Sequence, residues 1–561
     1  MHHLKHNQNH PFLAHHTAPT HKISMAFPLI VVAISTFFLL HLYSYSPFVL
    51  SMTTSANISI SRYQLFNLSI TLPIRARNTL NSLVREGDEV PLRKSPEGVV
   101  RTRSLLLPAW VILVVVEEED VLVDGELYCV FRNNATSKAR ASMALQSSGQ
   151  RTFKCGMPPS VRHRQPFHQP ALMRSLEKGF PGPAEHVPEL LRWNYLAYEA
   201  LSTESDVVVF VKGVNNRQGM SRSISELNCV FGDDPSTSIR TAVTSSAQEV
   251  FRCRQPDEAK ITDLLDGSGR LKVSIEIVGD KKVFPSMAYY SPGNKPLMED
   301  GNGNSDSTRS HLCACTMVYN AAKFLKEWVT YNSNIGVDRF ILYDNDSDDN
   351  LSAAIEELRG SGYDVRAVPW VWQKTQEAGF SHAAIVYLDT CSWMMYMDVD
   401  EFVYSPEWNK SPEPSSRMLK SLIPKNRPGR PKYGQVSIKC YEFGPSDQHS
   451  HPPSGVTQGS KQVSLEKAVV NHYKYQAWPE FKTKFRRRVS AYVVDWTRAI
   501  NLTSKDRAPG LGHEAVEPAG WAQKFCEVRD FGLKEMTARW SRCEARRSTA
   551  VIEYQDNLNS I

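Results

Sequence analysis

Segments with the composition of strands and segments with helical periodicity alternate strictly between residues 311 and 398. A helix that Asn320 could cap follows the first strand, and further helices are expected near Leu351 and Ala378. This β-α-β-α-β-α-β order favours a parallel sheet, wound like a nucleotide-binding fold. The sequence contains neither a Gly-x-Gly-x-x-Gly motif nor a Walker loop, so it indicates neither a dinucleotide cofactor nor P-loop chemistry. The expected strands are 311–318, 339–343, 364–368 and the apolar run before Asp398.

The last of these strands ends abruptly in three carboxylates, Asp398, Asp400 and Glu401. Carboxylates that crowd the end of a buried strand repel one another and lose hydration, so a positive ion is expected beside them. On an extended chain, Asp398 and Asp400 would point to the same face and could both bind one divalent metal ion. The alternative is a solvated acidic turn, because Asp-x-Asp is common by chance.

Ligands of open α/β sheets bind beyond the carboxyl ends of the strands, and two more strand ends are polar here. Thr316–Asn320 and Asp344–Asp348 could hydrogen-bond a base and a ribose, while Asp398–Glu401 could hold a metal ion on a diphosphate. A later basic stretch could reach the phosphates, unless it is a solvated helix face. The sequence thus predicts a nucleotide-sugar transferase site, in which metal and cations stabilise the departing diphosphate. The basic residues are Lys482, Lys484, Arg486, Arg487, Arg488, Arg498, Lys505 and Arg507.

An apolar run from Met25 to Leu42 follows a polar, His-rich amino end. The run is near the minimum length that spans a bilayer as a helix, and aromatic residues follow it as at a membrane interface. We therefore expect an uncleaved signal-anchor with a cytosolic amino end, with a cleaved signal peptide as the alternative. Sequons follow the run and none precedes it, which agrees with a lumenal body. They begin at Asn57, Asn67, Asn134, Asn345, Asn350, Asn409 and Asn501.

Strand-like segments dominate residues 98–290, and a cysteine motif repeats within them. Glu126-Leu-Tyr-Cys-Val-Phe131 recurs as Glu226-Leu-Asn-Cys-Val-Phe231, and Phe-x-Cys follows each copy. We expect each pair, Cys129–Cys155 and Cys229–Cys253, to join two neighbouring strands of a β-sandwich, although four cysteines allow three connectivities. Such a sandwich could bind a ligand or act as a spacer. The other cysteines are Cys313, Cys315, Cys391, Cys440, Cys526 and Cys543; they could include a Cys526–Cys543 bridge or be buried free thiols.

The length of 561 residues is too great for one core, so several domains are expected. A formal net charge of +6 is only mildly basic and no nucleic-acid-binding motif accompanies it, so no nucleic acid partner is expected. The expected organisation is a cytosolic tail (1–24), a transmembrane signal-anchor (25–45), a stem (46–97), a β-rich domain (98–290), a linker (291–308), an α/β domain (309–545) and a tail (546–561).

The α/β domain contains a succession of longer motifs. They include Cys315-Thr-Met-Val-Tyr-Asn320, Tyr343-Asp-Asn-Asp-Ser-Asp348, Gln376-Glu-Ala-Gly-Phe-Ser-His382, Met397-Asp-Val-Asp-Glu-Phe402 and Asn471-His-Tyr-Lys-Tyr-Gln-Ala-Trp478. Together they resemble glycosyltransferase family 92 over roughly residues 310–535. The resemblance implies a GT-A fold, a divalent metal that is usually manganese, a UDP-sugar donor and inversion at the anomeric carbon.

Plant members of this family include β-1,4-galactan synthases, Golgi enzymes that extend pectic side chains with galactose from UDP-galactose. The resemblance therefore implies a single-pass type II Golgi membrane protein with a lumenal catalytic domain. Its acceptor would be an oligo- or polysaccharide, and a homodimer is allowed.

The resemblance also implies roles for individual residues. Asp398 and Asp400 would hold the metal together with His472, for which a structural role is the alternative and His513 the second choice. Inversion needs a general base, normally a carboxylate, and spacing does not choose between Glu442, Asp495 and Asp506. A glycan at the Asn345 sequon would obstruct the site, so this sequon is expected to be unused. The nucleotide sugar would contact Thr316, Asn320, Asp344, Asn345, Arg486 and Arg487.

The Asp-x-Asp motif and the domain organisation are also compatible with two other functions. Haloacid-dehalogenase-like phosphatases also carry Asp-x-Asp, but they place it after the first strand and have Thr or Val where Phe402 stands here. The non-enzyme alternative is a catalytically inactive Golgi protein that binds glycans or acts as a scaffold. The inactive alternative is disfavoured, because Asp398, Asp400 and His472 are all present.

Overall fold

The computed structural model describes the chain in several segments. The chain divides into two compact units, 1–56 and 57–561, and every described residue belongs to the second. Among the described residues, no helix is long and apolar enough to cross a bilayer. The expected signal-anchor lies outside the described residues, as do Arg486, Arg487, Asp495, Asp506, His513, Cys526 and Cys543. The described residues are 58–61, 100–117, 125–163, 165–174, 179–181, 187–215, 221–234, 236–292, 309–423, 435–444, 468–484, 517, 519–524 and 530–541.

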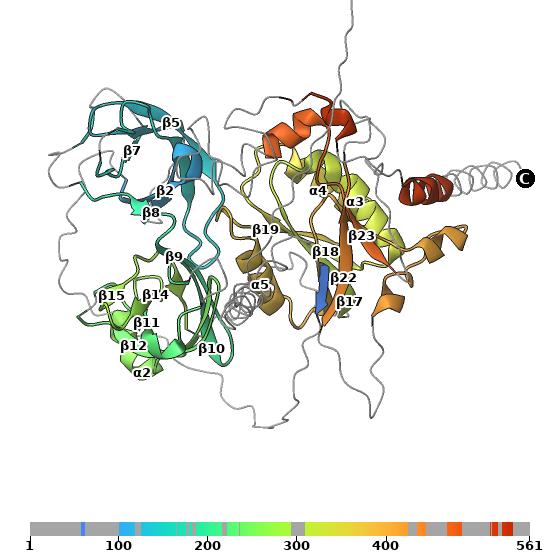
Figure 1. Ribbon diagram of the computed structural model, residues 1–561. Coiled ribbons are helices and arrows are strands. Elements are labelled where there is room, and N and C mark those ends of the chain that lie inside the picture. Colours follow the sequence, from blue (N-terminus) through green and yellow to red (C-terminus); the bar gives the residue numbers. More distant parts are fainter. Residues whose placement is uncertain are drawn as a thin grey trace, which may run out of the picture. The chain divides into compact units, whose positions relative to one another are not determined.

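Four parallel strands form the part of the main sheet that carries the predicted motifs (Figure 1). Their order in the sheet is β19 (Val365–Pro369), β18 (Arg339–Asp344), β17 (Ser310–Val318) and β20 (Cys391–Tyr396). The connecting helices are α3 (Ala322–Ile335), α4 (Leu351–Gly360) and α5 (Gln376–Val386). All seven elements lie where the alternating pattern predicts them. The strand order reverses between β17 and β20, which is where such sheets bind their ligands.

The same sheet continues beyond β20 with strands from distant parts of the chain. It runs from β20 through β1, β22 and β23 to β21. β1 is antiparallel to both β20 and β22, and β21 is antiparallel to β23, so the complete sheet is mixed. β1 lies within the expected stem, because a strand of four residues is too short to show a periodic pattern. The bounds are β1 (Ile58–Ser61), β21 (Glu401–Tyr404), β22 (Gln435–Glu442) and β23 (Val469–His472).

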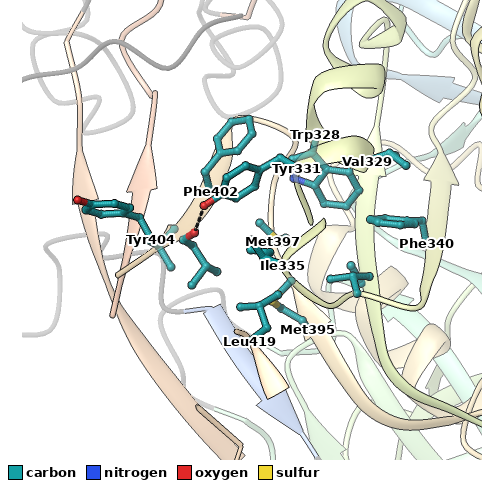
Figure 2. Close-up of a cluster of buried hydrophobic side chains, with 14 of the residues drawn as sticks. Trp328, Val329, Tyr331, Ile335, Phe340, Met395, Met397, Phe402, Tyr404 and Leu419 are labelled. Carbon is teal, nitrogen blue, oxygen red and sulfur yellow. Dashed lines mark hydrogen bonds between the residues drawn. The ribbon is translucent and has the colours of Figure 1, made fainter. Parts of the chain in front are cut away.

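One face of α3 packs against the sheet (Figure 2). Trp328, Val329 and Ile335 have no exposed surface, and they recur at the spacing of a single helix face. The ring of Trp328 meets Phe340 of β18 edge to face, with centroids 5.5 Å apart. Burial of each large apolar side chain contributes about 2 kcal/mol, so this face holds the helix on the sheet.

The two ends of α3 are formed by residues outside its apolar face. The backbone N–H of Ala322 donates to Asp349 Oδ2 at 2.9 Å, so the prediction that Asn320 caps this helix is wrong. Asn320 has a φ of +50°, and its side chain is bound instead to Asp348. At the other end, Gly336 has a φ of +124°, a conformation that glycine adopts readily.

The β-rich region forms two sheets, and each has a cluster of buried side chains of its own. The first has the order β7-β4-β5-β6-β3-β2-β8 and the second β15-β14-β11-β12-β13-β10-β9, with β16 paired to β14. The first comprises β2 (Thr102–Leu107), β3 (Val111–Val116), β4 (Leu127–Val130), β5 (Thr136–Ser142), β6 (Thr152–Gly156), β7 (Ala171–Met173) and β8 (Leu191–Arg192). The second comprises β9 (Leu196–Ser202), β10 (Asp206–Lys212), β11 (Leu227–Phe231), β12 (Ile239–Ala247), β13 (Val250–Arg254), β14 (Leu271–Ile277), β15 (Lys282–Val283) and β16 (Tyr289–Tyr290).

Both disulfides expected from the repeated motif are present, and each lies in the core of its own sheet. Cys129–Cys155 and Cys229–Cys253 have Cα–Cα distances of 6.3 and 5.9 Å, and all four cysteines are buried. The bridged strands are not neighbours, because β5 lies between β4 and β6, and β12 lies between β11 and β13. A third bridge, Cys313–Cys391, was not predicted, since neither cysteine belongs to a repeated motif.

A buried histidine of α5 gives the fold a pH dependence. His382 lies among Tyr343, Trp370 and Phe210, and its Nδ1 is 2.8 Å from the Tyr343 hydroxyl. Burial lowers the pKa of His382 from 6.5 to about 3, so the folded protein keeps it neutral. Between these two pH values the unfolded chain binds a proton that the folded chain does not, so stability falls as the pH falls.

Replacement of His382 with glutamine removes this contribution. We expect the difference in unfolding free energy between the wild type and His382→Gln to shrink by about 2 kcal/mol from pH 7 to pH 5. Urea denaturation at each pH measures it. A difference that stays constant with pH would contradict the neutral, buried state.

Candidate active site at the end of strand β20

Asp398 to Glu401 form a tight turn between β20 and β21, here called the acidic turn. The backbone N–H of Glu401 donates to the carbonyl of Asp398 at 3.1 Å, and Glu401 Oε2 accepts from the Asp398 N–H at 2.9 Å. The expectation of an extended chain at this point is wrong, because these two bonds fold the backbone back on itself. The turn, rather than strand alternation, therefore brings Asp398 and Asp400 together.

Strand β23 supplies the imidazole that completes the cluster. His472 lies opposite Glu401 in the register of β21 and β23. Its Nε2 is 3.7 Å from Asp400 Oδ1 and its Nδ1 is 3.7 Å from Glu401 Oε1. One ligand atom each from Asp398, Asp400 and His472 lie within 4.8 Å of one another. The fold thus gathers the three residues that the sequence analysis assigns to the metal.

The chemistry of this donor set fits a divalent metal ion. His472 Nε2 is buried and makes no hydrogen bond to any described residue, which is costly unless another group satisfies it. Two carboxylates and one imidazole suit an ion such as Mn²⁺. A second group, Glu401, Cys440 and His472, also lies within 4.8 Å, but its thiol would suit a softer ion.

Burial and neighbouring charges shift the pKa values of the acidic turn and of His472. Burial raises the pKa of Glu401 to about 8, and repulsion from Asp398 adds to the shift. Burial would also raise the pKa of Asp400, but Lys484 and His472 outweigh it and hold that pKa below its ordinary value. Burial opposes protonation of His472, yet Asp400 raises its pKa to about 10. Negative charge on Asp400 therefore depends on its positive neighbours Lys484 and His472.

Three long polar side chains contact the two aspartates. Lys484 Nζ lies 2.5 Å from Asp400 Oδ2, and Gln476 Nε2 lies 3.4 Å from the same oxygen. Gln376, the first residue of α5, donates from Nε2 to Asp398 Oδ1 at 2.7 Å. Of the predicted basic stretch, Lys484 thus reaches the acidic turn.

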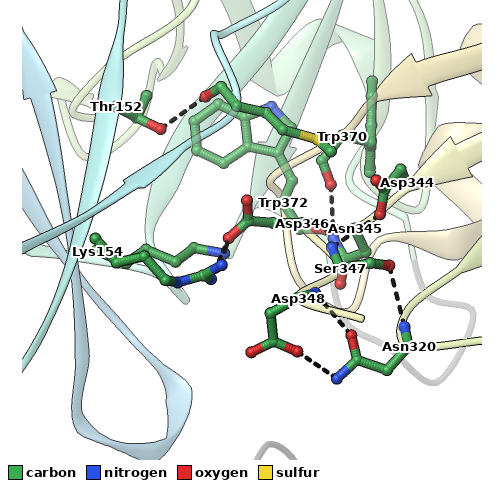
Figure 3. A network of polar contacts seen from close by, with 12 residues as sticks. Thr152, Lys154, Asn320, Asp344, Asn345, Asp346, Ser347, Asp348, Trp370 and Trp372 are labelled. Atoms are coloured by element: carbon green, nitrogen blue, oxygen red, sulfur yellow. Dashed lines mark hydrogen bonds and ion pairs between the residues drawn. The ribbon is translucent and has the colours of Figure 1, made fainter. Parts of the chain in front are cut away.

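The loop of residues 344–349 begins at the carboxyl end of β18 (Figure 3). It is called the donor loop below, because the sequence analysis expects it to contact the nucleotide-sugar donor. Its polar groups bind one another: Asp344 Oδ1 accepts from the Ser347 N–H at 2.9 Å, and the Asn320 N–H donates to Ser347 Oγ at 3.0 Å. Burial raises the pKa of Asp344. Asn320 and Asp344 therefore shape this loop. Thr316, by contrast, is fully buried within β17, and its hydroxyl has no partner among the described residues.

The Asn345 side chain is buried and attaches the donor loop to the segment that follows β19. It is 1% exposed, and its Nδ2 donates to the carbonyl oxygens of Trp370 and Trp372 at 2.7 and 3.0 Å. A side-chain amide held in this way is inaccessible to a glycan. This burial supports the expectation that the sequon is unused, and the reason is packing of the Asn345 side chain.

Among the candidates for the general base, Glu442 is within the described residues. It lies opposite His472 in the parallel register of β22 and β23, and it forms an ion pair with Lys474 at 2.5 Å. About a third of its side chain is exposed. Glu442 therefore lies on β22, the strand next to the one that carries the candidate metal ligand His472.

Two contacts of the site were not predicted from the sequence. Gln376 belongs to a motif of the family resemblance, but its contact with Asp398 was not expected. Glu401 was expected as one of three carboxylates, but its bond to the Asp398 backbone depends on how the turn folds.

The fold and the site define an α/β domain with a candidate metal centre where its strand order reverses. The model of the family described as glycosyltransferase family 92 matches residues 309–458. A family 92 protein of Ricinus communis is 32% identical over 540 residues, which are 87% of this chain and 90% of that protein. One of Oryza sativa is 32% identical over 490 residues, or 78% and 80%. One of Arabidopsis thaliana is 38% identical over 388 residues, which are 61% of this chain and 66%, just under two thirds, of that protein.

This chain belongs to glycosyltransferase family 92. The resemblance found in its motifs is thereby confirmed. Family membership supports glycosyl transfer as the reaction class of this chain.

Proposed function

We propose that the chain is a metal-dependent inverting glycosyltransferase of the GT-A type that moves a sugar from a UDP-sugar to a glycan acceptor. The convergence of Asp398, Asp400 and His472 at the reversal of strand order carries this proposal. These three residues would hold a divalent ion, manganese by our proposal. When bound, the ion would supply positive charge for the departing diphosphate.

The surrounding side chains add positive charge for the diphosphate and orient the candidate metal ligands. Lys484, beside Asp400, adds a positive group where a metal-bound diphosphate would lie. Gln376 fixes one oxygen of Asp398, and Glu401 fixes its backbone N–H and faces His472 Nδ1. Ligands that are oriented before binding lose less freedom when the ion and the nucleotide arrive.

The groups proposed to contact the nucleoside and the acceptor lie at the ends of neighbouring strands. The donor loop and Asn320 lie at the ends of β18 and β17, where they would contact the uridine. Glu442 is the described candidate for the base that deprotonates the acceptor hydroxyl, and Asp495 and Asp506 remain candidates beside it.

The resemblance to plant galactan synthases supports more specific proposals. We propose that the donor is UDP-galactose and that the acceptor is a β-1,4-galactan. We also propose that the protein is a single-pass Golgi enzyme with a lumenal catalytic domain, and that it can act as a homodimer.

Release of UDP by the purified full-length chain tests the proposal. We expect turnover of UDP-galactose with Mn²⁺ and a β-1,4-galacto-oligosaccharide, a loss of at least about a hundredfold after chelation, and recovery when Mn²⁺ is restored. Turnover of a different UDP-sugar would retain the transferase and remove the galactan assignment. No turnover of any donor, together with no binding of UDP, would contradict the function and favour the scaffold alternative.

A further inference from the structure

One acidic side chain of the donor loop is bound by the β-rich region. Asp346 Oδ2 accepts from Arg140 Nη2 at 2.8 Å and from Lys154 Nζ at 2.5 Å (Figure 3). Arg140 lies on β5 and Lys154 on β6, both in the first β-rich sheet. This contact therefore joins the donor loop to a part of the chain that lies outside the family 92 match.

The contact is buried and holds an unusual backbone conformation. The side chains of Asp346 and Lys154 are 4% and 9% exposed, whereas that of Arg140 is 47% exposed. Without Lys154, the buried Asp346 carboxylate would keep the half-exposed Arg140 as its partner, and an ion pair with an exposed group is the weaker of the two. Asp346 also has a φ of +62°, a region that residues other than glycine adopt at a cost. The ion pair thus stabilises one shape of the loop.

That shape determines where the polar groups of the donor loop lie. Asp344 and Ser347, on either side of Asp346, bind each other. Ser347 and Asp348 then bind Asn320, beyond the end of β17. A displacement at Asp346 would therefore move the groups proposed to contact the nucleoside.

A second anchor holds the segment of residues 370–375. Trp372 Nε1 donates to Glu199 Oε2 on β9 at 3.0 Å, and Lys212 Nζ on β10 donates to the carbonyl of Lys374 at 3.2 Å. The segment leads directly into Gln376, which donates to Asp398. The second β-rich sheet is thereby connected to a candidate metal ligand.

We propose that the β-rich region is a positioning element of the donor site, with Arg140 and Lys154 acting on the donor loop through Asp346. The part of this inference that concerns nucleotide affinity rests on the proposed function. The part that concerns the order of the donor loop does not.

The test first compares three single variants of the full-length chain. Lys154→Met removes the charge, Lys154→Arg restores it, and Lys138→Met is the matched control. Lys138 lies on β5 in an exposed pair with Glu126, its side chain 66% exposed. Hydrogen exchange over residues 344–349 and the affinity for UDP with Mn²⁺ are the two measurements.

We expect Lys154→Met alone to accelerate exchange in the donor loop and to weaken UDP binding by about tenfold, with substantial recovery in Lys154→Arg. After Asp346→Asn, which removes the partner charge, Lys154→Met should have little further effect on UDP affinity. Asp346→Asn alone also tests the contact if Lys154→Met does not fold.

Two outcomes would overturn the proposal. One is unchanged exchange in the donor loop of both Lys154→Met and Asp346→Asn. The other is a lower melting temperature with exchange raised throughout the protein but UDP affinity unchanged, which a purely structural contact would give. Failure of the wild type to bind UDP would instead contradict the proposed function, and exchange in the donor loop would still decide the inference.

Discussion

Asparagine in place of Asp398 is expected to lower kcat/KM by about a thousandfold or more. The substitution keeps the shape of the side chain, and its amide oxygen can still accept from Gln376. It removes one of two negative charges that would bind the metal ion, and metal-assisted stabilisation of a leaving group is worth several kcal/mol. Titration of the variant with Mn²⁺ should show weakened binding, a readout that does not depend on turnover.

The same substitution should leave the fold intact. Burial and the neighbouring Asp400 raise the pKa of Asp398, so its charge is unfavourable in the protein without metal. We therefore expect the melting temperature of Asp398→Asn to equal or exceed that of the wild type. Asp389→Asn, an exposed aspartate of the same domain, is the control for the loss of one charge. A variant with wild-type kcat/KM would remove Asp398 from the site.

The largest loss of stability is expected from Gly336→Ala. Gly336 ends α3 with a φ of +124°, which alanine adopts only with strain. An added Cβ would also collide with the carbonyl oxygen of Ser416, in a segment that is fixed because the Leu419 N–H donates to Ile335 at 2.9 Å. Strain and overpacking together should lower the unfolding free energy by about 3 kcal/mol or more, as measured by denaturant unfolding.

Gly360→Ala provides the matched control for this loss. Gly360 is the exposed last residue of α4, and an added Cβ would meet no atom within 4 Å. Alanine restricts the unfolded chain and favours the helix, so this variant should be unchanged or more stable by up to about 1 kcal/mol. Equal effects of the two substitutions would refute the assignment of a steric role to Gly336.

The elements of the α/β domain were predictable from the sequence because each has a strong local signal. The apolar face of α3 recurs at helical spacing, and the strands around it are continuous apolar runs. The signal fails where structure depends on distant partners. β1 becomes a strand because β20 and β22 flank it, and nothing within Ile58–Ser61 indicates those partners.

In the site, too, residues with a local sequence signal could be predicted, whereas contacts with distant residues could not. Asp398 and Asp400 stand out in the sequence as charges that interrupt an apolar run, and His472 followed from the family resemblance. The contacts of Asn345 and Asn320 could not be predicted, because the partner of a polar side chain depends on how a loop folds. Both residues lie at the expected strand ends, yet much of their hydrogen bonding shapes the loop itself.

The position of β1 also bears on how the protein is made. The ribosome synthesises this strand hundreds of residues before β20 and β22, the two strands that it joins in the sheet. Until both have emerged, the nascent chain must keep β1 available, a long-range pairing of the kind that folds slowly. An expression fragment that begins at residue 309 would lack this strand and leave two open sheet edges, which invite pairing with other chains and aggregation.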